Sequence, residues 1–147
     1  MSAEQPVTIL LVEDDPGHAR LIERNLRRAL ITNSIVTLSD GQQAVDYLFR
    51  EDTYAGATHP LPLLLLLDLN LPVLDGTQVL TRLKADARTK HIPVIILTTT
   101  DEPDEIKRCY ELGCSVYLTK PVEYEQFAEA MRKLGLFLSI VTLPMGE

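Results

Sequence analysis

Short apolar runs that suit buried strands recur along the chain. The run at 7–12 is rich in β-branched residues and apolar on both faces, which is typical of a strand inside a parallel sheet. Five consecutive leucines at 63–67, between Pro62 and Asp68, are too few for a helix and therefore predict a central strand. We expect strands over 7–12, 34–38, 63–67, 93–97 and 116–118.

Between these runs, hydrophobic residues recur at intervals of three and four, which is the period of a helix face. The first such stripe consists of Ala19, Ile22, Leu26 and Ala29. Asp75 is a suitable N-cap for a later helix, and Gly113 takes the position of a C-cap glycine. The polar segment 50–62 predicts a surface loop. We expect helices over 19–29, 42–49, 75–83, 106–112 and from 124 to near the end of the chain.

Strands and helices that alternate in this way predict an α/β fold. The strands must run parallel and be joined by right-handed crossovers, which gives an open, doubly wound sheet. The 147 residues suit a single domain. Such sheets bind ligands beyond the carboxyl ends of their strands, where the strand order reverses. The residue that follows each strand is therefore the first place to look for function.

Composition and charge narrow the class of partner. A formal net charge of −7 argues against nucleic acid or an anionic membrane, because both attract clustered Lys and Arg. Cys109 and Cys114 fit no zinc or redox spacing and are too few for a disulfide framework. No signal peptide is visible, and no apolar run approaches the length of a membrane span. We therefore expect a cytoplasmic protein.

The residues after the strands form a non-random set. Glu13 and Asp14 follow the first strand, Asp68 the third, Thr98 the fourth, and Lys120 lies just beyond the fifth. Carboxylates this close repel one another and need a cation, and a site with only oxygen ligands suits Mg²⁺. A hard cation beside a carboxylate, a hydroxyl and an ammonium can handle a phosphoryl group. Each residue alone has an ordinary explanation, since Asp14 or Asp15 could simply cap the first helix. Their presence at one sheet edge favours a site.

Four ordered motifs carry a resemblance to a known family. They are LVEDD at 11–15, LDLNLP at 67–72 followed by Asp75-Gly76, LTT at 97–99 and YLTKP at 117–121. Over about residues 7–134 the chain resembles the receiver domain of two-component response regulators. The resemblance implies a flavodoxin-like, five-stranded parallel sheet with strand order 2-1-3-4-5. The long loop before the leucine run and the end of the chain resemble those of the small single-domain regulators paired with cyanobacterial and bacterial phytochromes.

The resemblance also implies a metal-dependent phosphorylation site. Asp68 would be the residue that accepts the phosphoryl group. Asp14 would bind Mg²⁺ or Mn²⁺ directly, Glu13 mainly through a metal-bound water, and Asn70 through its backbone carbonyl. Asp15 is an additional acid with a lesser role, as a cap of the first helix.

Further residues would bind the phosphoryl group and respond to it. Lys120 would pair with the phospho-acceptor and then with a phosphoryl oxygen, and its bond to Pro121 is usually cis in this family. Thr98 would turn to bond the phosphoryl group, and Tyr117 would move inward with it. Thr99 is bulkier than the residue usual at this position, so we expect it to modulate dephosphorylation by restricting the attacking water.

The C-terminal region predicts a partner surface. The helix from Tyr124 has one apolar stripe for the sheet, but from residue 136 onward a second apolar face appears. We expect this face to form a homodimer interface, with 135–147 as an extension of the core. Its residues are Leu136, Phe137, Ile140 and Leu143.

Several other interpretations stay open. The kinase that phosphorylates the chain could be a phytochrome, another histidine kinase, or a member of a phosphorelay. A haloacid-dehalogenase-type phosphatase would use a similar residue set, but it needs a second acid where this chain has Asn70. A nucleic-acid-binding regulator would need an output domain, and 27 residues after Lys120 leave room for one helix and a tail. We expect output through protein contact. His18, His59 and His91 do not form a site together, and His18 is more typical of a surface residue than of a metal ligand.

Overall fold

The computed structural model describes residues 8–59 and 61–134. The strands are β1 (Thr8–Val12), β2 (Ser34–Leu38), β3 (Leu64–Leu67), β4 (Val94–Thr98) and β5 (Val116–Thr119). The helices are α1 (Pro16–Arg28), α2 (Gly41–Phe49), α3 (Gly76–Lys84), α4 (Pro103–Leu112) and α5 (Tyr124–Lys133), with a short 3₁₀ helix η1 (Asp52–Tyr54). The predicted alternation of strands and helices is therefore confirmed.

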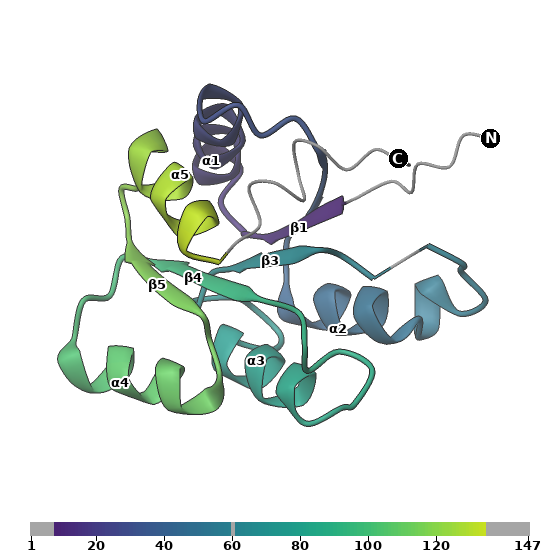
Figure 1. Ribbon diagram of the computed structural model, residues 1–147. Helices are drawn as coiled ribbons and strands as arrows, with labels where there is room; N and C mark the ends of the chain where they lie inside the picture. The colour runs from purple at the N-terminus through teal and green to yellow at the C-terminus, as the bar shows by residue number, and fades with distance from the viewer. Residues whose placement is uncertain (1–7, 60, 135–147) are drawn as a thin grey trace.

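The five strands form one parallel sheet with the order β2-β1-β3-β4-β5, as predicted. Helices α1 and α5 cover one face of the sheet, and α2, α3 and α4 cover the other (Figure 1). The strand order reverses between β1 and β3, because the chain moves outward to β2 before it returns to the centre. This reversal is where a doubly wound sheet offers a cleft at its carboxyl ends.

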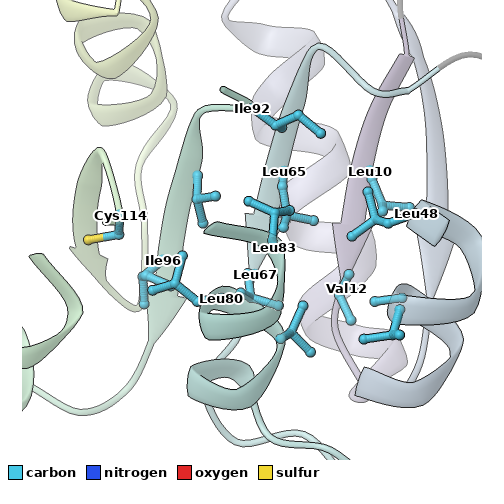
Figure 2. Packing of buried hydrophobic residues seen from close by; sticks show 14 of the residues in the cluster. Leu10, Val12, Leu48, Leu65, Leu67, Leu80, Leu83, Ile92, Ile96 and Cys114 are labelled. Atoms are coloured by element: carbon cyan, nitrogen blue, oxygen red, sulfur yellow. The ribbon is translucent and has the colours of Figure 1, made fainter. Parts of the chain in front are cut away.

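The central strands bury both of their faces. In β1, Ile9 and Leu11 pack under α1 and α5, whereas Leu10 and Val12 pack against α2 and α3. Figure 2 shows the second of these layers, where the side chains of β1, β3 and β4 meet those of α2 and α3. Strand β3 supplies leucines to both layers and is fully buried, which explains why four of the five consecutive leucines, Leu64–Leu67, form a strand here.

Capping side chains start the helices close to the carboxyl edge of the sheet. Asp15 accepts a hydrogen bond from the backbone N–H of His18, so it is Asp15 and not Asp14 that caps α1. Asp75 forms a capping box with Gln78 at the start of α3. Gly113 ends α4 in the left-handed conformation, with φ 112°. The caps predicted at Asp75 and Gly113 are confirmed.

Two local predictions differ from the structure. Helix α4 begins at Pro103, three residues before the predicted start, because proline suits the first position of a helix and two acidic residues follow it there. The segment 50–62 is more ordered than a plain surface loop, since it contains η1 and packs the rings of Tyr54 and His59 against Tyr47. Neither feature has an apolar period that would reveal it in the sequence.

The described part of α5 packs on the sheet as its stripe predicts. Phe127 and Met131 are fully buried, and Tyr124 and Leu134 are half-buried beside them. The predicted dimer residues Leu136, Phe137, Ile140 and Leu143 lie outside the described residues. Within the described residues, no helix is both long and apolar enough to cross a membrane.

Candidate functional site

The carboxyl edge of the sheet brings three acidic side chains together. Glu13 follows β1, Asp14 is next to it, and Asp68 follows β3, the neighbouring strand. One carboxylate oxygen from each lies within 4.8 Å of the other two. Glu13 and Asp68 are 3% and 5% exposed, whereas Asp14 lies open to solvent. Two of the three carboxylates are therefore buried, and the third, that of Asp14, is accessible to solvent.

Local backbone packing brings the start of α3 against Asp68. The loop after β3 turns back so that the N–H of Gly76 donates to the carbonyl of Leu69, at 2.9 Å. A Cβ atom at position 76 would lie 2.3 Å from the carbonyl oxygen of Asp68, a distance that no side chain tolerates. Glycine is required here because the two backbones touch. The Asp-Gly pair of the sequence thus shapes the loop that presents Asp68.

Lys120 supplies a positive charge to the site. Its Nζ donates to Oε1 of Glu13 at 2.5 Å and to Oδ2 of Asp68 at 3.2 Å. The lysine side chain is 10% exposed, so these ion pairs are shielded from water. The bond from Lys120 to Pro121 is cis, as the family resemblance implies. Sequence reasoning paired Lys120 with Asp68 alone and missed its contact with Glu13.

Electrostatics make the site receptive to a cation. Burial raises the pKa of Glu13, and the negative charge of Asp68 raises it further, while the hydrogen bond from Lys120 opposes both effects. A carboxylate whose charged form is disfavoured gains stability from any additional positive charge. The donor set consists of carboxylate oxygens, which are the ligands that Mg²⁺ and Mn²⁺ accept. The residues present thus fit a hard divalent cation.

Thr98 and Asn70 border the site next to the end of β4. Thr98 is fully buried at the end of β4, and its Oγ1 lies 3.4 Å from Nδ2 of Asn70. The backbone N–H of Asn70 donates to Oδ1 of Asp68 at 3.2 Å. Asp68 is therefore held at both oxygens, with Lys120 on one and a backbone amide on the other.

Tyr117 and Thr99 lie farther from the three acids. The hydroxyl of Tyr117 donates to the carbonyl of Thr100 at 2.7 Å, and burial raises the pKa of this hydroxyl to about 12. Tyr117 thereby joins β5 to the loop after Thr98. Thr99 is exposed and lines a pocket of about 200 Å³ together with Lys120. Thr99 therefore lies at the solvent-exposed rim of the site, and Tyr117 is bonded to the loop beside it.

One histidine also belongs to the surroundings of the lysine. Nδ1 of His18 lies 3.2 Å from Nζ of Lys120 and 3.9 Å from Oε2 of Glu13. Sequence reasoning considered His18 only as a possible metal ligand and assigned it to the surface, so it missed this contact, which spans 102 residues. Of the other two histidines, His59 packs on Tyr47 and His91 is exposed.

Comparisons with known proteins agree with this geometry. The family described as "Response regulator receiver domain" matches residues 9–132. The chain is 38% identical to "Response regulator Rcp1" of Synechocystis sp., over 95% of this chain and 94% of that protein. It is also 40% identical to "Probable methanogenesis regulatory protein FilR2" of Methanothrix harundinacea, over 91% of this chain and 84% of that protein.

Among solved structures, the chain resembles regulators that are named for phytochromes. "Bacteriophytochrome response regulator RtBRR" superposes with a TM-score of 0.83 at 37% identity, over 95% of this chain and 84% of that one. The Mn²⁺-bound form of Rcp1 superposes with a TM-score of 0.76 at 34% identity, over 97% of this chain and all of that one. The family match, the fold and the arrangement of Asp68 beside Lys120 together show that this chain belongs to the response regulator receiver family and closely resembles its phytochrome-associated members.

Proposed function

We propose that the chain accepts a phosphoryl group on Asp68 from a sensor histidine kinase, in a reaction that depends on Mg²⁺ or Mn²⁺. The observation that carries the proposal is the pairing of a buried carboxylate, Asp68, with the ammonium of Lys120 beside two further acids. A single lysine cannot neutralise three carboxylates and an incoming phosphoryl group. The arrangement therefore suits a site completed by a divalent cation.

The chemistry follows from the positions of these side chains. A carboxylate oxygen of Asp68 attacks the phosphorus of a phosphohistidine as the P–N bond breaks, and the electron pair of that bond stays with the departing imidazole. Glu13, Asp14, Asp68 and the carbonyl of Asn70 would hold the cation, which would supply positive charge to offset that of the phosphoryl oxygens. Lys120, which already reaches Asp68, would offset the same charge with its ammonium. Water later attacks the acyl phosphate, and Thr99 at the rim limits its approach.

The same residues convert phosphorylation into a change at the surface. A phosphoryl group brings negative charge and strong acceptor oxygens close to Oγ1 of Thr98. A movement of Thr98 toward these oxygens would pull on its neighbour Thr100, whose carbonyl accepts the hydrogen bond from Tyr117. Thr98, Thr100 and Tyr117 would then shift together, and α4 and β5 would present a different surface.

The proposed partners are proteins. Rcp1 and RtBRR support a phytochrome-type kinase as the phosphoryl donor, whereas FilR2 shows that close relatives also include a protein named for another process. We propose that the whole chain, 1–147, is one receiver unit that acts in the cytoplasm, catalyses only its own phosphorylation and dephosphorylation, and signals by protein contact without binding nucleic acid. Leu136, Phe137, Ile140 and Leu143 form the proposed homodimer surface.

Intact mass measurement tests the proposal. The chain is incubated with acetyl phosphate and Mg²⁺, with matched samples that contain a chelator or the variant Asp68→Asn. We expect the mass of one phosphoryl group to appear only in the wild type with metal. A gain of the same mass by Asp68→Asn, or in the presence of the chelator, would contradict the assignment. Steady release of phosphate from a general phosphomonoester would favour a phosphatase instead.

A further inference from the structure

One face of α1 contacts the segment that carries Lys120 at three successive points. His18, Ile22 and Asn25 are spaced by four and three residues, which places them on the same side of the helix. Opposite them, in the same order, are the ammonium of Lys120, the side chain of Val122 and the carbonyl of Val122. No other described helix donates or accepts a side-chain hydrogen bond at residues 120–122.

The first contact completes the hydrogen bonding of the lysine. An ammonium has three N–H donors, and Nζ of Lys120 has three acceptors within 3.2 Å, namely Glu13, Asp68 and Nδ1 of His18. The backbone of His18 is fixed in turn, because its N–H donates to the capping carboxylate of Asp15 at 3.0 Å. In the tautomer whose Nδ1 carries no proton, the imidazole is thus a third acceptor for the ammonium, and its backbone is anchored by Asp15.

The last contact fixes the backbone just beyond the lysine. Nδ2 of Asn25 donates to the carbonyl of Val122 at 2.8 Å, across 97 residues of sequence. Between the two polar contacts, Ile22 and Val122 are each 5% exposed and belong to the same hydrophobic cluster. The lysine is therefore held at its tip by His18 and at its base by Asn25.

We propose that His18 and Asn25 are positioning residues for Lys120 in phosphoryl transfer. Neither residue touches Asp68 in the described structure, and neither is one of the acidic groups that would hold a metal. When a phosphoryl oxygen replaces Asp68 as a partner of the ammonium, Glu13 and His18 remain to keep Nζ in place. This inference rests on the proposed function, since it assigns a role within the reaction at Asp68.

A double-mutant cycle separates positioning from general structural support. The initial rate of phosphoryl gain from acetyl phosphate, at saturating Mg²⁺, is measured for wild type, His18→Leu, Lys120→Ala and the double variant. We expect His18→Leu to slow the wild type about fivefold, the effect of one hydrogen bond of about 1 kcal/mol. The same change in the Lys120→Ala background should have no further effect, because the group it positions is gone.

Conservative replacements sharpen the test. His18→Asn keeps an acceptor at the same point along the side chain as Nδ1, and we expect it to restore most of the rate that His18→Leu loses. Asn25→Leu should slow transfer in the same way, again only when Lys120 is present. Arg24→Ala is the matched control, because Arg24 is exposed on α1 and has no role in the site. Its rate should equal that of the wild type.

Three results would overturn the inference. His18→Leu could leave the rate unchanged, slow both backgrounds by the same factor, or lower the rate and the unfolding midpoint while His18→Asn restores neither. The Asp68→Asn variant keeps the proposed function separate. If wild type and Asp68→Asn gain the phosphoryl group equally, the proposed function fails; if only wild type gains it and the cycle is additive, the positioning role alone fails.

Discussion

Two partly buried lysines lie at opposite ends of the sheet, and their partners differ in charge. At the carboxyl end, Nζ of Lys120 bonds to the carboxylates of Glu13 and Asp68. At the amino end, Nζ of Lys84 donates to the backbone carbonyls of Lys90 and Ile92, both at 2.8 Å. The stem of Lys84 passes over Gly113, where a Cβ atom would lie 3.0 Å from it.

This difference shows what makes a lysine able to respond to a signal. The carbonyls around Lys84 are neutral and never change charge, so that lysine ties the end of α3 to the start of β4. Burial lowers the pKa of Lys84, and no carboxylate of the described residues lies within ion-pair distance of it. Lys120 instead balances charges that phosphorylation and metal binding alter. Its contacts are expected to change when the protein is switched.

The largest expected effect is the loss of the response in Lys120→Ala. This variant should still accept a phosphoryl group on Asp68, at a lower rate, because the nucleophile remains. Without the ammonium the group no longer pulls on β5, so the change in hydrogen exchange over β4, α4 and β5 upon phosphorylation should disappear. Hydrogen exchange of the variant and the wild type, measured with and without acetyl phosphate, tests this prediction. If the variant showed the full wild-type change in hydrogen exchange, the contrast drawn between Lys120 and Lys84 would be wrong.

Asp14→Asn should have the next largest effect, on metal binding. The substitution removes the accessible carboxylate of the acidic cluster, so we expect Mg²⁺ to bind at least about tenfold more weakly. The metal-free protein loses a repulsive charge and should become slightly more stable. Calorimetric titration gives the affinity, and thermal unfolding with a chelator gives the stability. Unchanged affinity would remove Asp14 from the site.

Lys84→Ala should affect stability and leave the chemistry alone. Two hydrogen bonds from a partly exposed ammonium are lost, which we expect to lower the free energy of unfolding by about 1–2 kcal/mol. Urea unfolding provides that measurement. The rate of phosphoryl gain serves as the control, and a marked fall in that rate would mean that the amino end of the sheet is coupled to the site.

The smallest expected effect is a change in the pH dependence of stability in Glu13→Gln. The folded protein raises the pKa of Glu13 above its ordinary value of 4.5, chiefly through burial. Ionisation of Glu13 therefore lowers the free energy of unfolding as the pH rises above 4.5. With metal removed, Glu13→Gln should be more stable than wild type near pH 7, and the difference should shrink as the pH falls through 4.5. An equal difference at every pH would show that charge at Glu13 is not the cause.

The fold was largely predictable because its signals are local. The leucine run of β3, the cap at Asp75 and the glycine at 113 each specify structure within a few residues. Where a segment lacks an apolar period, as in the aromatic packing of Tyr54 and His59 on Tyr47, the sequence predicted only a loop. That packing depends on contacts between side chains, which no pattern of hydrophobic positions encodes.

In the candidate site, too, some features could be predicted from the sequence and others could not. Residues at the ends of strands or directly after them, such as Glu13, Asp68 and Thr98, could be placed at one sheet edge because parallel strands end together. The contacts of His18 and Asn25 with the segment of Lys120 could not be predicted, since they span 102 and 97 residues. His18 and Asn25, four and three residues from Ile22, share its helix face, but that spacing does not identify their partners.

The most direct test of the account is to locate the phosphoryl group. After reaction with acetyl phosphate and Mg²⁺, the protein is reduced with borohydride, which converts an aspartyl phosphate to homoserine, and its peptides are sequenced by mass spectrometry. We expect homoserine at position 68 in wild type treated with acetyl phosphate, and none there in wild type reduced without phosphodonor treatment. Homoserine at Asp14 or at any other aspartate, with Asp68 intact, would contradict this assignment.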